Sequence, residues 1–274
     1  MIDFFRLFLL VNLACYGSLR GQESVTASSA VSCSTCDSVP TMQLSKEALL
    51  GKIRPAQDSG FALVSPKYTT DTLDIYLRKS TYEAFLRMAQ AAQEAGITLR
   101  IISATRSFAV QRWIWEAKWS GRRKVGGLNL KDTIPDPKQR ALKILEYSSM
   151  PGTSRHHWGT DIDLNALRNS YFASGNGKKE YDWLVAHAGD YGFCQVYTEQ
   201  NENRPDGYHE EKWHWSYLPL AQQFLQQYNQ QISYSDIEGF EGGSMAEDIG
   251  AIEKYVNGIA PQCQVEPADK SQED

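Results

Sequence analysis

Two short segments of this chain combine residue types that bind a transition metal and activate water. The first runs from Met150 to Asp163 and includes His156, and the second contains Glu211 and His214. Two imidazoles and a carboxylate are typical ligands of catalytic zinc, which keeps its fourth position open for water or substrate. The segments therefore predict one catalytic Zn2+ ion bound by His156, Asp163 and His214 in a hydrolase.

Two of the predicted ligands have a neighbour that would serve equally well by residue type. His157 directly follows His156, and Asp161 precedes Asp163 by two residues, so both carboxylates would face the same side of a strand. The spacing does not decide between the members of either pair. Gly159 would allow close backbone approach at the turn that folds this segment around the ion.

Glu211 is the candidate general base. Side chains three residues apart on a regular strand point to opposite faces, so we expect a bulge or turn between Glu211 and His214. Glu211 would then take a proton from the water that the metal activates and pass it to the leaving amine. The alternative is a surface carboxylate beside Glu210 and Lys212.

Four other residues are candidates for assisting the reaction or binding the substrate. Arg106 follows a predicted strand, where its guanidinium would stabilise an oxyanion or bind a substrate carboxylate. Ser154 and Gln111 would donate hydrogen bonds to the substrate backbone or its terminal carboxylate. Trp213 would contact substrate beside His214, although a tryptophan here more often packs in the core.

The hydrophobic pattern places these residues among short strands and helices. A capping box over 80–83 predicts the start of a helix that ends at Gly96. A strand over 97–102, a helix that contains Gln111, a polar loop over 121–137 and a helix from near Pro137 follow.

After the metal-binding segment, the pattern predicts a helix, a strand, a polar loop, a strand and a final helix. Their ranges are 178–191, 193–197, 198–207, 211–217 and 219–228. Because neither a repeated strand-helix-strand rhythm nor a glycine-rich nucleotide loop occurs, we predict an α+β fold with a small, mostly antiparallel sheet flanked by helices.

The composition excludes one class of partner. The 274 residues are 42% hydrophobic and 22% charged, with a net charge of -5. This is ordinary globular composition, and it lacks the excess of clustered Lys and Arg that nucleic acid requires. We therefore expect no nucleic-acid partner, and the sequence does not indicate an oligomeric state.

The N-terminal residues predict export. An apolar stretch from Phe4 to Ala14 has the length of a signal-peptide core and is too short to span a bilayer. We expect residues 1–22 to be a signal peptide, with Cys15 a candidate for lipidation and thus for a membrane tether. The Ser- and Thr-rich residues 23–45 would form a flexible tether before a zinc peptidase domain over 46–229.

Four cysteines besides Cys15 suit an oxidising compartment: Cys33, Cys36, Cys194 and Cys263. They allow three pairings. One hypothesis is a Cys194–Cys263 disulfide, which would hold residues 230–274 against the body. We expect these residues to form a C-terminal extension with one short helix over 245–256.

Three blocks of residues together resemble a known family. They are Thr105-Arg106-Ser107-Phe108-x-x-Gln111, Ser154-x-His156-x-x-Gly159-x-x-x-Asp163 and Glu211-x-Trp213-His214. In this order, over roughly residues 80–220, they resemble the VanY-type D-alanyl-D-alanine carboxypeptidases of the LAS zinc peptidases. The resemblance implies a LAS-peptidase-like fold, the zinc ligands given above, Glu211 as base, Arg106 at the polarised carbonyl and Ser154 near the substrate.

The resemblance also implies a substrate and a location. The family removes the C-terminal D-alanine from peptidoglycan stem peptides, so we expect an enzyme of the bacterial periplasm or cell envelope. The choice between DD- and LD-carboxypeptidase stays open, as do an endopeptidase that cuts within the stem and a zinc-stabilised binding module. The presence of Glu211 and Arg106 argues against the binding module.

Three positions depart from the family pattern. Arg155 replaces the acidic residue that is common before the metal-binding histidine, Asp161 replaces a small apolar residue, and Lys212 stands where proline is expected. Asp161 is therefore also a candidate partner for one of the metal ligands.

Overall fold

The computed structural model describes residues 41–70 and 74–264, which belong to one folding unit over Val39–Asp274. The predicted signal peptide, Cys15, Cys33, Cys36 and most of the predicted tether lie outside the described residues. Within the described ranges, none of the helices has both the length and the apolar character needed to cross a bilayer.

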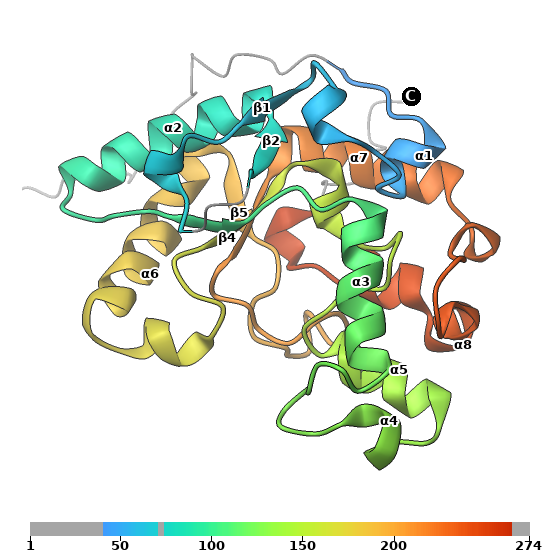
Figure 1. Cartoon of the computed structure of the whole chain (residues 1–274). Coiled ribbons are helices and arrows are strands. Elements are labelled where there is room, and N and C mark those ends of the chain that lie inside the picture. The colour runs from blue at the N-terminus through green and yellow to red at the C-terminus, as the bar shows by residue number, and fades with distance from the viewer. Residues whose placement is uncertain (1–40, 71–73, 265–274) are drawn as a thin grey trace, which may run out of the picture. The chain divides into compact units, whose positions relative to one another are not determined.

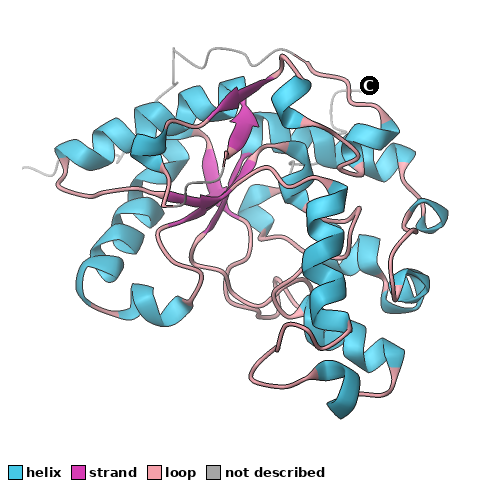
Figure 2. Ribbon diagram, viewed as in Figure 1, coloured by secondary structure: helices cyan, strands magenta, loops and turns pink. Residues whose placement is uncertain are grey.

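A four-stranded antiparallel sheet carries both predicted metal-binding segments (Figures 1 and 2). Its strands lie in the order β3 (Ile101–Ser103), β4 (Asp161–Leu164), β6 (His214–Tyr217) and β5 (Phe193–Gln195). A separate two-stranded antiparallel sheet pairs β1 (Phe61–Leu63) with β2 (Tyr76–Arg78).

The register of β4 and β6 decides which side chains meet. Asp163 lies opposite His214, and Asp161 lies opposite Ser216. Residues that face each other across antiparallel strands share one side of the sheet, so these four polar side chains lie on the same face. Ile162 and Leu164 alternate to the other face and belong to the hydrophobic core.

Helices surround the sheet, as Figure 2 shows. They are α1 (Lys46–Leu49), α2 (Lys79–Glu94), α3 (Phe108–Trp119), α4 (Leu130–Thr133), α5 (Pro137–Leu145), α6 (Gly175–His187), α7 (Leu218–Gln231) and α8 (Ala246–Ile249). Helix α3 packs against α5, and α1 packs against α7. The predicted α+β fold with a small antiparallel sheet is confirmed.

The predicted start of α2 is wrong. The helix begins at Lys79, with Arg78 as the N-cap and no side-chain capping bond, so Ser80 lies inside the first turn. The Lys79 amide donates to the carbonyl of Gly60 at 3.0 Å instead. This tertiary bond satisfies one of the amides that the first turn of a helix leaves without a partner inside the helix.

The end of α2 agrees with the prediction. Gly96 has a φ of +75°, in the left-handed region. Its amide donates to Gln93, and the Ile97 amide donates to Ala92. These two bonds form a Schellman motif, which ends helices at a glycine.

Other elements differ in length from the predictions. The predicted loop over 121–137 contains α4, which Asn129 caps through its side chain. The predicted helix over 245–256 is broken at Gly250, whose φ of +72° ends α8 before a π-helix begins at Ala251. The strands are shorter than predicted, and β3 starts only at Ile101.

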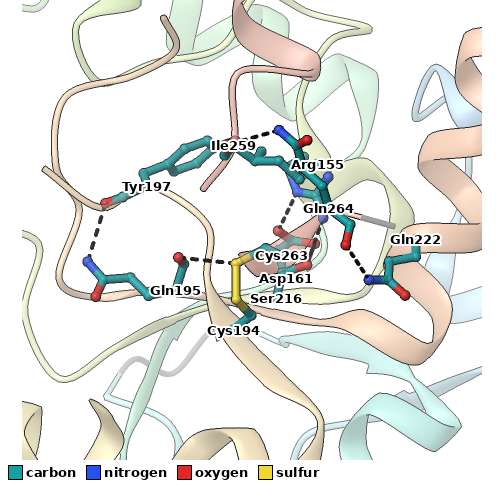
Figure 3. Close-up of a disulfide and its surroundings, with 10 residues drawn as sticks. All are labelled: Arg155, Asp161, Cys194, Gln195, Tyr197, Ser216, Gln222, Ile259, Cys263 and Gln264. Atoms are coloured by element: carbon teal, nitrogen blue, oxygen red, sulfur yellow. Dashed lines mark hydrogen bonds and ion pairs between the residues drawn. A yellow bond between two sulfur atoms is a disulfide. The ribbon is translucent and has the colours of Figure 1, made fainter. Parts of the chain in front are cut away.

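The C-terminal extension packs on the body at two places. Near α3, the ring of the fully buried Trp115 donates to the carbonyl of Glu241 at 2.8 Å and packs edge-on against Phe240. At the sheet, a disulfide joins Cys194 in β5 to Cys263, as Figure 3 shows. The structure thus contains the pairing that the cysteine count left as one hypothesis.

Candidate active site

The three predicted metal ligands converge. Asp163 Oδ1 lies 3.4 Å from His156 Nε2 and 3.4 Å from His214 Nδ1. One ligand atom from each residue falls within 4.8 Å of the others, and all three side chains are buried. His156 Nε2 and Asp163 Oδ1 have no hydrogen-bond partner among the described residues. Buried polar atoms are normally paired, so these atoms fit a set of metal ligands.

The His157 ring points away from the position where the three candidate ligand atoms converge. Its Nδ1 lies 2.7 Å from the carbonyl of Arg106, and its Nε2 accepts from the Gly152 amide at 3.0 Å. Both ring nitrogens are therefore used, and burial lowers the pKa of His157 to about 3. The ring is neutral and connects two loops, which removes His157 as a rival of His156.

Asp161 lies behind His214 rather than at the metal point. Its Oδ1 accepts from His214 Nε2 at 3.0 Å and from Arg155 Nε at 3.2 Å. Metal-binding histidines usually donate their second ring nitrogen to a carboxylate or carbonyl. The structure therefore places Asp161 beside His214 and Asp163 within the candidate set of metal ligands.

The irregularity predicted before His214 is present. Residues 212 and 213 form a turn ahead of β6, and the His214 amide donates to the Glu211 carbonyl at 3.1 Å. The turn brings Glu211 Oε2 to 3.1 Å from His214 Nδ1. Glu211 thus lies on the metal side of the sheet, where a general base is needed.

Burial and neighbouring charges shift the pKa values of the site residues in different directions. Burial raises the pKa of Glu211, which makes it a stronger base than an exposed glutamate. Burial also lowers the pKa of His156. Burial lowers the pKa of His214 too, but hydrogen bonds to Asp161 and Glu211 outweigh it and raise the pKa to about 9. Asp163 stays ionised, because the nearby His156 offsets burial and brings its pKa to about 2.

Arg106 reaches the site with support from Gln111. Its Nη2 lies 3.8 Å from Asp163 Oδ2, and its Nη1 donates to Gln111 Oε1 at 3.0 Å. The Gln111 amide in turn donates to the Ser149 carbonyl at 2.7 Å, and the side chain is fully buried. Gln111 therefore holds Arg106 in place, which is not the direct substrate contact that the sequence suggested.

Ser154 is buried inside the protein, whereas Trp213 lines a pocket. Ser154 is buried, and its Oγ has no hydrogen-bond partner within the described part of the chain. Trp213 lines a pocket of about 460 Å³, together with Asp163, Glu211 and Arg106. Its ring lies 6.4 Å from that of Tyr147, a pocket residue that is 48% exposed.

The pocket also contains cations outside the predicted site residues. Lys118, Arg123 and Arg168 line it with Arg106. Among the described residues, no carboxylate forms an ion pair with Lys118, Arg123 or Arg168. Lys118 lies in the last turn of α3, seven residues after the motif that ends at Gln111, so only the folded arrangement places it in the pocket.

A family model described as VanY, D-alanyl-D-alanine carboxypeptidase, matches residues 74–220, which is more than half of the chain. The chain belongs to this family. The match covers the three blocks from Arg106 to His214, and the family predicted from those blocks is confirmed.

Individual relatives of the VanY family are distant. The chain is 26% identical over 149 residues to YodJ of Bacillus subtilis (strain 168), whose name assigns it provisionally to the carboxypeptidases. This match spans 52% of the chain and 46% of YodJ, less than half of that protein.

Two solved structures have low similarity to the chain. The LD-carboxypeptidase LdcB, described for its peptidoglycan recognition, is 20% identical with a TM-score of 0.44, and covers 72% of this chain and 79% of its own. A mutant of the vancomycin-resistance D,D-pentapeptidase VanY in complex with Zn(II) is 19% identical with a TM-score of 0.42. It covers 62% of this chain and 89% of its own.

Proposed function

We propose that this member of the VanY family is a zinc-dependent carboxypeptidase that removes the C-terminal D-alanine from peptidoglycan stem peptides. The observation that carries the proposal is a buried set of metal ligands, with Glu211 beside it, that opens into a cationic pocket. Zinc fits the ligands, because two imidazoles and a carboxylate leave one position free.

The charge of the pocket supports cleavage at the end of a peptide. A carboxypeptidase must bind the free carboxylate of its substrate. Lys118, Arg123 and Arg168 offer positive charge, and none of them is ion-paired with a carboxylate within residues 41–70 and 74–264. An endopeptidase cuts away from the end of the chain and does not require a site for a terminal carboxylate next to the scissile bond.

Each residue of the centre has a role in the proposed reaction. Zinc, when bound, supplies Lewis acidity and makes water nucleophilic near neutral pH. Glu211 accepts a proton as the water oxygen attacks the scissile carbonyl carbon. Arg106 stabilises the negative charge that develops on the carbonyl oxygen. Glu211 then gives the proton to the amine as the C–N bond breaks, which releases D-alanine.

We propose export to the cell envelope as the location. The apolar residues 4–14 and the Cys194–Cys263 disulfide support it, since disulfides persist in oxidising compartments. Lipidation of Cys15 would then tether the enzyme to a membrane.

Defined stem peptides test the function directly. Purified protein with zinc is incubated with a pentapeptide that ends in D-Ala-D-Ala, with a tetrapeptide that ends in one D-Ala, and with the C-terminal amides of both. Mass spectrometry identifies the products. We expect loss of one alanine from a free acid and much slower cleavage of its amide.

Two controls and two contrary outcomes make the result decisive. Glu211→Gln and chelator-treated protein should be inactive. Cleavage inside the stem, at equal rates for acids and amides, would show an endopeptidase. Tight zinc binding with all peptides intact would favour the non-catalytic binding module.

A further inference from the structure

A buried ion pair lies on the metal side of the sheet but outside the ligand set. Arg155 Nε donates to Asp161 Oδ1 at 3.2 Å, and the two side chains are 1% and 0% exposed. Arg155 Nη2 also donates to Ser216 Oγ at 2.9 Å, and Ser216 Oγ donates to Asp161 Oδ2 at 3.1 Å. The Thr160 hydroxyl completes the set of donors around the carboxylate.

This pair consists of two of the three residues that depart from the family pattern. Arg155 stands in the place of an acidic residue, and Asp161 in the place of a small apolar one. The structure shows that the two departures depend on each other. Without Asp161, the guanidinium of Arg155 would be buried with no carboxylate beside it, which is strongly destabilising.

Stability alone does not account for the pair. Two charges lose their hydration on burial, and well-packed apolar residues of similar volume are often equally stable or more so. A buried pair of this kind therefore requires another explanation. The position of Asp161 supplies one, because its Oδ1 also accepts from His214 Nε2 at 3.0 Å.

We propose that Asp161, held by Arg155, is a positioning residue for the metal centre. It accepts the Nε2 proton of His214 and thereby presents the unprotonated Nδ1 to the point that Asp163 and His156 share. Arg155 keeps the carboxylate in one orientation and balances its charge. This inference rests on the proposed zinc site, and it assigns a role to two residues outside the ligand set.

The second imidazole is held in a different way. His156 uses its Nδ1 on the carbonyl of Ala104 at 2.7 Å, so a neutral backbone group fixes that ring. A carboxylate is a stronger acceptor than a carbonyl and increases the donor strength of the ring it binds. His214 is therefore the ligand whose affinity for the metal depends on charged side chains.

The C-terminal extension lies beside the Arg155–Asp161 pair, through the disulfide of Cys263 to Cys194. Cys194 lies opposite Ser216 in the register of β5 and β6, and Asp161 lies opposite Ser216 in that of β4 and β6. The three side chains form one row across the sheet, and Figure 3 shows the Cys194–Cys263 disulfide beside Arg155 and Asp161. The row keeps water away from the ion pair, which preserves its strength.

Two double variants separate positioning from plain stability. Arg155→Met with Asp161→Ala removes both charges and the acceptor for His214. Arg155→Met with Asp161→Asn removes the charges but keeps an acceptor oxygen of the same reach. Zinc affinity is measured by competition with a chromophoric chelator, the Co2+ absorption spectrum reports ligand geometry, and thermal unfolding of the metal-free protein reports stability.

We expect the alanine variant to unfold near the wild-type temperature and to bind zinc about 10- to 100-fold more weakly, with a changed Co2+ spectrum. The asparagine variant should lose less affinity and keep the wild-type spectrum. If the alanine variant folds and binds zinc within threefold of wild type, the proposal is wrong. A wild type that binds no zinc would refute the proposed function itself.

A measurement on the unmodified protein covers the case of a variant that does not fold. In the zinc-loaded wild type, NMR of the His214 ring should show a slowly exchanging Nε2 proton in a hydrogen bond. A rapidly exchanging proton, or Nε2 as the metal-bound atom, would overturn the assignment.

Discussion

The metal centre and the wall of the pocket are built in contrasting ways. At the centre, the side chains of His156, Asp163, Glu211 and His214 are buried, and the rings of both histidines have a specific partner on at least one nitrogen. On the wall, Arg123 and Arg168 are exposed, and with Lys118 they have no carboxylate partner among the described residues. The side chains of the centre are thus held in place without substrate, whereas the cations of the wall would gain a charged partner when substrate binds.

This difference suggests where catalysis and specificity reside. Preorganised groups in a site that excludes water stabilise a transition state without a reorganisation cost. Exposed long side chains bind charged ligands with adaptable geometry, at the expense of rotamer freedom. Changes at the centre should therefore abolish turnover, and changes on the wall should alter binding.

The largest expected effect is loss of the metal itself. His214→Ala removes one of three ligands and leaves Asp161 without the ring that it holds. We expect loss of stoichiometric zinc, measured by elemental analysis after gel filtration, and loss of all activity. Retention of one zinc per chain would remove His214 from the ligand set.

The next largest effect tests the base. Glu211→Gln keeps the shape of the side chain but cannot accept a proton. We expect zinc content to stay the same and kcat to fall about 10²- to 10⁴-fold, the usual contribution of general acid–base catalysis. Steady-state kinetics with the stem pentapeptide measures this. Unchanged kcat would assign the proton transfer to another group.

A smaller effect, confined to binding, is expected on the wall. Burial and the charges of Arg123 and Arg106 lower the pKa of Lys118 from 10.5 to about 8. Because only protonated lysine attracts a carboxylate, KM should rise as pH increases through about 8. Lys118→Met should raise KM by about tenfold with little change in kcat, as expected when about 1.4 kcal/mol of uniform binding is lost.

Lys118→Arg is the matched control for that experiment. Arginine stays protonated throughout the accessible pH range, so the alkaline rise in KM should disappear. An identical pH profile in this variant would show that another group titrates. An equal fall in kcat and kcat/KM in Lys118→Met would show that Lys118 acts in the transition state, as the residues of the centre do. The proposed division between catalysis and binding would then be wrong for Lys118.

The smallest expected effect on turnover comes from the disulfide. Cys194→Ser with Cys263→Ser should lower the free energy of unfolding by about 2 to 4 kcal/mol, because the bond closes a long loop in the unfolded chain. Denaturant titration measures this loss. At temperatures well below unfolding, kcat should change little, since neither sulfur contacts the pocket.

The sequence predicted the centre better than its surroundings. The ligand types, the turn before His214 and the glycine at the end of α2 all depend on local spacing, which a sequence displays. The choice of His156 over His157 does not, because it depends on loops at Gly152 and Arg106 that accept or donate to the His157 ring.

The remaining errors have the same cause. The start of α2 is set by a bond from Lys79 to Gly60, which lies in the turn before β1. The cations of the pocket come from α3 and two loops. Contacts between segments distant in sequence decide these features, and no periodic pattern encodes them.

The two imidazoles direct different ring nitrogens at the point where the candidate ligand atoms converge. Movements of β6 and of the turn that carries His156 would therefore displace a bound ion to different extents. Nδ1 of His214 lies close to its own main chain, whereas Nε2 of His156 lies at the far end of its ring. An ion bound there would follow any displacement of β6 almost directly, while the turn that carries His156 has a longer arm and can shift by rotating its side chain. Strand β6 is thus the reference from which the position of the ion is set.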